Sequence, residues 1–279
     1  MEIKRFRYGA VIGGRGWLGK EISNVLSGSG LVVEMVGDSS WNLTSYKRYF
    51  EKEDPQFLIS AVRMSKYDQV NSYLECLKFV AQQCIERNIR LVHAGSASEY
   101  GDLGARSIQE SSTCKPQSDY GKLKLAESEI LARNINLGLD AVIGRIFNLV
   151  GVGQPNHTAL AQIYSTILNL SEKGEGAYSL NDHDIVRDYV FLNDIALAFK
   201  TLLNSSACGI VNLGSGTGTA LSQLVSRMCK TLNIEFEFGN LSEHRIKSVV
   251  ANTDFAESLG IRLQPAETMN FKELFHSYE

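Results

Sequence analysis

A tyrosine and a lysine lie four residues apart in the sequence DYGKLK, at Tyr120 and Lys124. On a helix, residues at this spacing share one face and lie one turn apart. A phenol has a reference pKa of about 10, and a nearby cation favours its charged form. Ser96, just after the apolar run Leu91–Ala94, offers a hydroxyl that could share the same substrate oxygen. These three residues are candidates for moving a proton on or off an alcohol or carbonyl oxygen.

A second candidate site follows the apolar segment Tyr8–Ile12, which runs into the glycine-rich sequence GGRGWLG. A strand, a glycine loop and a helix in this order are typical of dinucleotide-binding turns. Gly13 permits the tight turn, Gly16 lets a pyrophosphate approach the backbone, and Gly19 lets the helix pack closely on the strand. The helix N-terminus adds free N–H groups for the anion. The candidate cofactor-binding residues of this loop are Gly13, Arg15, Gly16, Trp17, Leu18 and Gly19.

Two residues give opposite indications about the dinucleotide. Asp38 follows the expected strand Leu31–Val36 and lies about twenty positions beyond the glycines, where an acidic residue can accept the ribose hydroxyls of NAD. Arg15 lies inside the glycine loop, where a guanidinium could meet the 2′-phosphate of NADP. The sequence therefore predicts NAD or NADP without deciding between them.

Short apolar segments alternate with helical patterns along the first 147 residues. We expect further strands at 56–62, 90–95 and 139–146, and helices at 18–26, 44–51, 67–88 and 118–134. This alternation predicts an α/β fold with a doubly wound parallel sheet. Ligands bind such sheets outside the carboxyl ends of the strands, so the glycine loop, the segment after Val62 and Ser96 should share one cleft.

Beyond residue 147 the pattern becomes less regular, with loops, short strands and helices. We expect a dinucleotide-binding domain at 1–147, which segments at about 188–232 rejoin. We expect a smaller substrate-binding lobe at 148–187 and 233–279. Thr44 and Asn193 are the expected N-caps of two helices.

Composition limits the possible partners and compartments. The net charge is -3 and no Lys/Arg cluster stands out, which argues against a nucleic-acid partner. No apolar run approaches the roughly 18 residues of a membrane helix, and glycine interrupts the first apolar run too early for a secretory signal. The five cysteines are scattered without a C-x-x-C pair, so we expect free thiols, no metal site and a cytoplasmic protein.

Taken together, these motifs resemble the extended short-chain dehydrogenase/reductases, a family of nucleotide-sugar epimerases, dehydratases and reductases. GGRGWLG and the Tyr120/Lys124 pair match its glycine and catalytic motifs, and Ser96 stands four residues before Tyr100, as in the family. RDYV at 187–190 and NLGSG at 212–216 resemble two later motifs. The resemblance implies a Rossmann-type fold with a smaller C-terminal lobe that binds a nucleotide sugar.

The resemblance also implies roles for individual residues. Tyr120 would be the acid or base, Lys124 would favour its phenolate and hold the nicotinamide ribose, and Ser96 would orient the sugar oxygen. Further residues expected to contact the cofactor are Asn42, Ala61 and Asn71, and residues expected to contact the substrate are Ser98, Asn148, Arg187 and Arg245.

Departures from the family pattern narrow the expected reaction. The 4,6-dehydratases carry an Asp-Glu pair directly after the catalytic Thr, where this chain has Ala97 and Ser98. GDP-fucose synthase carries a Cys at the position of Ser98, so we expect no 3,5-epimerisation, and we expect His157 only to begin a helix. Asp119 replaces the proline that usually precedes the catalytic Tyr in this family, and we expect this difference to alter the entrance for the substrate.

The N-terminal third looks most like GDP-fucose synthase and the dTDP-4-dehydrorhamnose reductases. We therefore expect an NAD(P)-dependent reductase of a nucleotide-linked 4-keto-6-deoxyhexose. A nucleotide-sugar 4-epimerase with tightly bound NAD would use the same residues, and a dinucleotide-binding sensor without chemistry is a third interpretation.

The resemblance further implies a homodimer, in which the helices expected at 67–88 and 118–134 form an intersubunit four-helix bundle. The first of these helices carries an apolar stripe at helical spacing. Its members are Val70, Tyr73, Leu74, Leu77, Val80 and Ala81.

Overall fold

A six-stranded sheet forms the centre of the computed structural model, which describes residues 6–36, 42–64, 67–101, 103, 107–174, 176–241, 248–265 and 270–271. The strand order is β2-β1-β3-β4-β5-β9, and every neighbouring pair is parallel. The strands are β1 (Tyr8–Ile12), β2 (Val32–Val36), β3 (Phe57–Ser60), β4 (Arg90–Ser96), β5 (Ala141–Ile146) and β9 (Gly209–Leu213). The order reverses between β1 and β3, so the expected doubly wound parallel sheet is confirmed.

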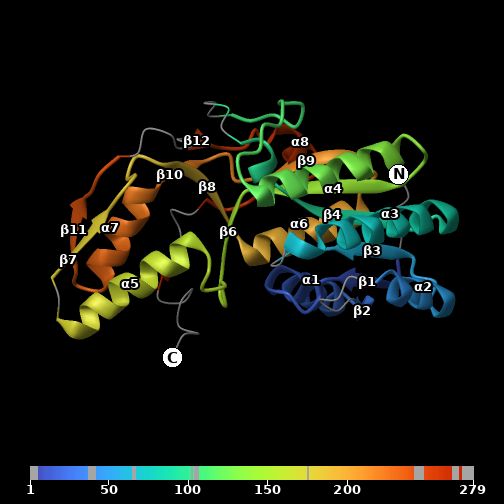
Figure 1. Cartoon of the computed structure of the whole chain (residues 1–279), viewed down its shortest axis with the longest axis horizontal. Coiled ribbons are helices and arrows are strands. Elements are labelled where there is room, and N and C mark those ends of the chain that lie inside the picture. Colours follow the sequence, from blue (N-terminus) through green and yellow to red (C-terminus); the bar gives the residue numbers. More distant parts are fainter. Residues whose placement is uncertain are drawn as a thin grey trace.

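Helices cover both faces of this sheet (Figure 1). On one face lie α1 (Trp17–Gly28) and α6 (Leu192–Asn204), which pack on each other. On the other face lie α2 (Leu43–Lys52), α3 (Val70–Arg87) and α4 (Asp119–Ile135). Alternate strand residues point to opposite faces: Val11 and Ile59 enter the core under α1 and α6, whereas Ala10, Ile12 and Leu58 enter the other core.

A smaller lobe lies beyond the carboxyl ends of the central strands (Figure 1). Its elements are β6 (Asn148–Val150), α5 (Ala159–Lys173), β7 (Ala177–Leu180), β8 (Val186–Phe191), β10 (Gly218–Ala220), α7 (Leu221–Thr231), β11 (Glu235–Phe238) and β12 (Ser248–Val249). β8 pairs with β6, β10 and β12, and β11 pairs with β7. A separate apolar core joins α5, α7, β7 and β11.

The segment 188–232 divides between the two parts. α6 and β9 belong to the six-stranded sheet and its covering layer, whereas α7 packs on α5, β7 and β11 in the smaller lobe. This packing favours assigning α7 to the smaller lobe, because its buried face belongs to that lobe's core. The domain boundaries themselves remain a prediction. The short helix α8 (Asp254–Ser258) returns to β9.

Three helix starts differ from expectation. Asn42, not Thr44, is the N-cap of α2, and its side chain accepts a hydrogen bond from the Thr44 N–H at 2.9 Å. Phe191 precedes α6, so Asn193 lies inside the first turn. The helix expected to begin at His157 begins at Ala159.

The apolar stripe of α3 packs within this chain. Tyr73, Leu77, Val80 and Ala81 are buried against the sheet, and Val70 and Leu74 are partly buried beside them. The stripe is thus explained without a second subunit, and the homodimer stays a prediction. Among the described helices, none is both long and apolar enough to cross a membrane.

Candidate active site

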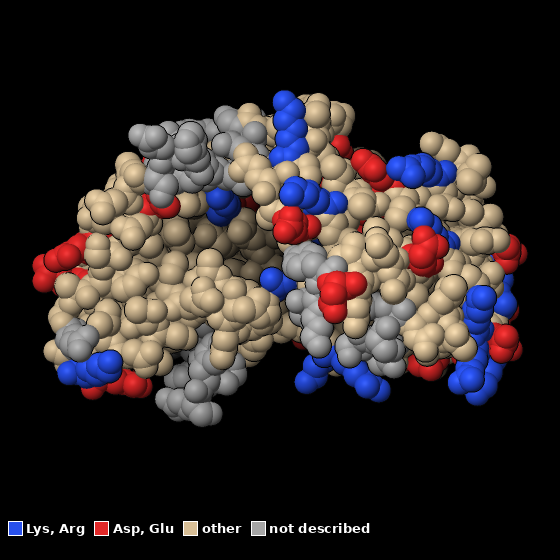
Figure 2. Space-filling view, in the orientation of Figure 1, with Lys and Arg blue, Asp and Glu red and all other residues tan. Residues whose placement is uncertain are grey.

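A cavity of about 1100 Å³ lies between the sheet and the smaller lobe. Figure 2 shows it as a hollow with basic side chains at its edge. Its walls come from the segments that follow β1, β3, β4 and β5, from α4, and from residues 148–160 of the smaller lobe. Arg15, Arg63, Lys124 and Arg187 line it, and no Asp or Glu does so among the described residues. A cavity of this charge and size suits two phosphate-bearing ligands.

Most of the candidate residues lie in this one cavity. Those that line it are Gly13, Arg15, Gly16, Trp17, Leu18, Ala61, Ser96, Ser98, Tyr120, Lys124, Asn148 and Arg187. Three candidates do not line it, namely Gly19, Asn42 and Asn71. Asn42 instead caps α2. Asp38 and Arg245 fall outside the residues that the structure describes.

The glycine loop is shaped to receive an anion. Gly13 has a φ of 79°, which favours glycine, and its carbonyl accepts a hydrogen bond from the Gly16 N–H at 2.9 Å. Gly16 precedes α1 and provides no side-chain cap, so the N–H groups of the first turn face the cavity end of the helix without such a partner. The loop therefore fits the pyrophosphate of a dinucleotide.

Gly19 acts through packing rather than by lining the cavity. A Cβ at this position would lie 2.2 Å from the Gly13 carbonyl oxygen, closer than real contacts allow. We expect Gly19→Ala to weaken dinucleotide binding at least tenfold and to lower stability by about 1–3 kcal/mol, because the loop must move away from α1.

Dinucleotide titration and urea unfolding check the Gly19 prediction. Gly28→Ala is the matched control, because it lies at the end of the same helix and its Cβ would meet nothing within 4 Å. Equal effects of the two substitutions would contradict the packing role of Gly19.

Ser96 ends β4 and begins the 3₁₀ turn Ala97–Glu99. Its Oγ accepts a hydrogen bond from the Ser98 N–H at 3.2 Å and lies 2.8 Å from the Ser98 Oγ. The buried Glu99 carboxylate accepts hydrogen bonds from the Ser96 N–H at 2.8 Å and from Arg145 at 2.8 Å. Glu99 thus stabilises the turn from inside the protein core and does not line the cavity.

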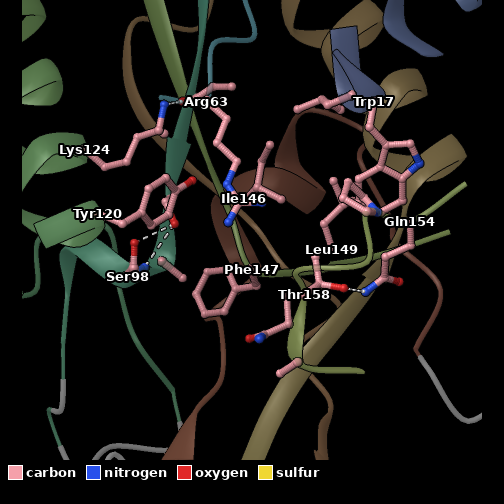
Figure 3. A pocket seen from close by; sticks show the side chains of 18 of the residues that line it. Trp17, Arg63, Ser98, Tyr120, Lys124, Ile146, Phe147, Leu149, Gln154 and Thr158 are labelled. Atoms are coloured by element: carbon pink, nitrogen blue, oxygen red, sulfur yellow. Dashed lines mark hydrogen bonds between the residues drawn. The ribbon is translucent and has the colours of Figure 1, made fainter. Parts of the chain in front are cut away.

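Tyr120 and Lys124 project from the first turns of α4, whose N-cap Ser118 accepts a hydrogen bond from the Gly121 N–H at 3.0 Å. Figure 3 shows Tyr120 between Lys124 and Ser98, at one wall of the cavity. The guanidinium carbon of Arg63 lies 5.6 Å from the centre of the Tyr120 ring. The expected helix therefore brings phenol and ammonium to the same side, as the four-residue spacing requires.

Lys124 is almost completely buried, and its ammonium has three hydrogen-bond donors. The acceptors are the carbonyls of Val62 at 3.0 Å and Ala94 at 2.9 Å, and Oε2 of Glu127 at 2.8 Å. Burial alone would lower the pKa of Lys124, but the Glu127 carboxylate raises it above the usual value. A contact between Lys124 and a cofactor ribose would require one of these bonds to be exchanged.

The two later sequence motifs meet at Asp188. Its buried carboxylate accepts hydrogen bonds from the N–H groups of Ser215 at 2.8 Å, Gly216 at 3.0 Å and Ala251 at 3.2 Å. Burial raises the pKa of Asp188, although these bonds act in the opposite direction. The neighbouring Arg187 lines the cavity, and its guanidinium donates to the Val186 carbonyl at 2.8 Å.

Arg63 and His157 contribute to the cavity although neither was a candidate. Arg63 follows β3 and forms a hydrogen bond with His157, which lies in the smaller lobe two residues before α5. Burial and the charge of Arg63 lower the pKa of His157. His157 is thus a cavity residue rather than the first residue of a helix. The sequence contains one indication of this role for Arg63, because a basic residue directly after a strand of a parallel sheet lies where such sheets bind ligands.

A family model described as GDP-mannose 4,6 dehydratase matches residues 64–267. The chain belongs to the extended short-chain dehydrogenase/reductases that modify nucleotide sugars.

Individual members of the family differ in reaction. A dTDP-6-deoxy-L-talose 4-dehydrogenase (NAD(P)(+)) from Kitasatospora kifunensis is 34% identical over 152 residues, which are 53% of this chain and 48% of that protein. This chain thus matches about half of the length of that curated relative.

Solved structures of family members share the fold. A UDP-glucose 4-epimerase from Thermotoga maritima, solved with UDP-glucose, has a TM-score of 0.78 at 18% identity, over 96% of each chain. A dTDP-glucose 4,6-dehydratase from Bacillus anthracis, solved with NAD, has a TM-score of 0.79 at 16% identity, over 97% of this chain and 94% of that one.

Proposed function

We propose that this enzyme reduces the 4-keto group of a nucleotide-linked 6-deoxyhexose, with NADH or NADPH as hydride donor. The observation that carries the proposal is the wall formed by Ser96, Tyr120 and Lys124 in a cavity that also contains the glycine loop. Ala97 and Ser98 occupy the positions beside Ser96 where a dehydratase would need acidic side chains. Ser96, Tyr120 and Lys124 can therefore move a proton at an oxygen, but the acidic side chains needed to eliminate water are missing beside them.

In this mechanism Tyr120 donates a proton to the sugar oxygen at C4. A nicotinamide held by the glycine loop would supply the hydride for the carbon. Ser96 holds the same oxygen through its hydroxyl, and Ser98 fixes the rotamer of Ser96 through their 2.8 Å contact. Lys124 provides the positive charge that favours the phenolate left after proton transfer. The Tyr120 phenol is restored by a proton from solvent.

The remaining parts of the cavity receive the two phosphate-bearing molecules. Gly13, Arg15 and Gly16 would hold the dinucleotide at the start of α1. Asn148 and Arg187, on the smaller lobe, would hold the diphosphate of the nucleotide sugar, because a guanidinium fork suits phosphate oxygens. The likeness to a 6-deoxy-L-talose 4-dehydrogenase supports a substrate of this type.

A 4-epimerase is the second candidate, because the same three residues can take the proton from the C4 hydroxyl and give it back, while a tightly bound NAD would accept the hydride and return it to the other face of the sugar. The two functions differ in how they use the cofactor. A reductase consumes reduced dinucleotide in step with a 4-keto sugar, whereas an epimerase converts UDP-sugars with no added cofactor.

The experiment incubates the purified protein with NADH or NADPH and a panel of dTDP-, GDP- and UDP-linked 4-keto-6-deoxy sugars. We expect loss of nicotinamide absorbance in proportion to the product, together with one preferred nucleobase. No loss with any member of the panel would overturn the reductase. Turnover of UDP-sugars by the protein as purified would then establish the epimerase.

A further inference from the structure

A buried cluster of ionisable side chains lies directly behind the wall of the cavity. Glu127 follows Lys124 by three residues on α4, so both side chains leave the helix on the same side. Oε2 of Glu127 lies 2.8 Å from the Lys124 Nζ and 2.8 Å from Nε2 of His93, on β4. All three side chains are at most 3% exposed. None of the sequence motifs included Glu127 or His93.

The hydrogen bonds place Glu127 between two donors. Nδ1 of His93 is buried and has no hydrogen-bond partner among the described atoms, so the ring carries its proton on Nε2 and donates it to Glu127. Glu127 then carries one negative charge and Lys124 one positive charge. Glu127 is the carboxylate that pairs with Lys124.

Lys124 needs this partner more than an exposed lysine would. Water is excluded from its ammonium, which disfavours the charged form by an effect that reaches ~3–5 pKa units for fully buried groups. Two backbone carbonyls offset part of that cost, but they carry no net charge. An oxidised nicotinamide in the same cavity would add a second positive charge and increase the cost further.

We propose that Glu127 is a positioning residue: it is the counter-ion that keeps Lys124 protonated and in place beside Tyr120 throughout the catalytic cycle. His93 holds the carboxylate toward the ammonium from the other side. The inference rests on the proposed function in that Tyr120 is taken as the acid. The claim that Glu127 keeps Lys124 protonated does not depend on which substrate the protein binds.

The pKa values of the two partners are shifted in agreement with this role. Burial alone would raise the pKa of Glu127, but Lys124 and the hydrogen bond from His93 hold it below the usual value. The other titratable groups that interact with the pair are Tyr73 on α3, Tyr120 on α4 and Glu99 in the turn after β4. Glu99 is itself paired with Arg145, which leaves Glu127 as the carboxylate in contact with Lys124.

The test follows the protonation of Lys124 directly in the full-length protein without substrate. Lysine labelled with ¹³C at Cε reports its charge by NMR, and the Lys124 signal is assigned by its loss in Lys124→Arg. In Glu127→Gln we expect the Lys124 titration midpoint to fall by about 2 pH units or more, because the amide keeps the shape but not the charge.

Glu129→Gln is the matched control. It removes the same charge from the same helix, but its side chain is 54% exposed and pairs with Arg133 at 3.3 Å. We expect its Lys124 midpoint to equal that of the wild type. Equal midpoints in Glu127→Gln and Glu129→Gln would overturn the proposal.

The wild-type protein provides a test that does not depend on a folded variant. Lys124 must remain protonated to a higher pH than the exposed lysines, and titration below them would overturn the proposal. In a coupled assay, the alkaline limb of kcat should move to lower pH in Glu127→Gln. The two proposals can fail separately. If the Lys124 midpoint shifts in Glu127→Gln but the protein reduces no 4-keto sugar, Glu127 remains the counter-ion of Lys124 and the proposed function is wrong.

Discussion

Replacing Tyr120 by phenylalanine is expected to lower kcat for keto-sugar reduction by a factor of about 10²–10⁴, the usual contribution of a positioned general acid. The phenol is the group that Figure 3 shows at the cavity wall beside Lys124 and Ser98. Phenylalanine keeps the ring, and therefore its contact with Arg63, but has no proton to give. KM for the nucleotide sugar should change little, because the phosphates are held by other residues.

Steady-state kinetics with a fixed dinucleotide concentration measure this effect. Tyr178→Phe serves as the control, since Tyr178 lies on β7 in the smaller lobe and packs in that lobe's core. We expect its kcat to stay within about twofold of the wild type, because Tyr178 lies away from the reacting groups and its substitution removes only a hydroxyl. A Tyr120→Phe enzyme with full kcat would remove Tyr120 from the mechanism.

Breaking the buried pair between Lys124 and Glu127 is expected to cost about 3–5 kcal/mol of unfolding free energy in either single variant, Lys124→Met or Glu127→Gln. Each substitution leaves the remaining side chain as a buried charge without its partner. The double variant removes both charges, so we expect it to be more stable than the sum of the two single effects predicts.

Urea unfolding at neutral pH measures the cycle. The exposed pair between Lys122 and Asp119 is the matched control on the same helix, with an N–O distance of 3.0 Å and side chains 63% and 78% exposed. Removing either partner there should cost less than about 1 kcal/mol. Additive effects at Lys124 and Glu127 would show that the two charges do not depend on each other.

The same pair gives a pH dependence with a defined sign. The pKa of Glu127 is lowered on folding, so its contribution is present above the ordinary glutamate pKa and is lost as pH falls through the folded value. The pKa of Lys124 is raised, so its contribution is present below the ordinary lysine pKa and is lost as pH rises through the folded value. Stability from the pair is therefore greatest between these two limits.

The features that could be predicted from sequence are those set by local pattern. The alternation of apolar strands with helices gave the parallel sheet, and the spacing of Tyr120 and Lys124 placed both side chains on one helix face. Strand, glycines and helix in succession predicted the glycine loop, and the strand order places it where the sheet reverses between β1 and β3. In each of these cases, neighbouring residues determine the geometry.

Other features depend on contacts between distant residues. Glu99 meets Arg145, 46 positions away, and nothing in the local pattern of either residue indicates the partner. The apolar pattern around His93 predicts only a strand, and the packing of α4 on β4 brings the side chain to Glu127. Glu127 itself could have been found, because a carboxylate three residues after Lys124 shares its helix face.

The Trp17 indole N–H donates a hydrogen bond of 2.7 Å to the carbonyl of Val152, which joins the start of α1 to the loop after β6. Under the proposed function, one side of this bond belongs to the loop that would hold the dinucleotide and the other to the lobe that would hold the sugar. If a ligand that shifts one end changes the free energy of binding at the other, the change is the same in both directions. We therefore expect the cofactor and sugar affinities to be linked, and a substitution at Trp17 to change both.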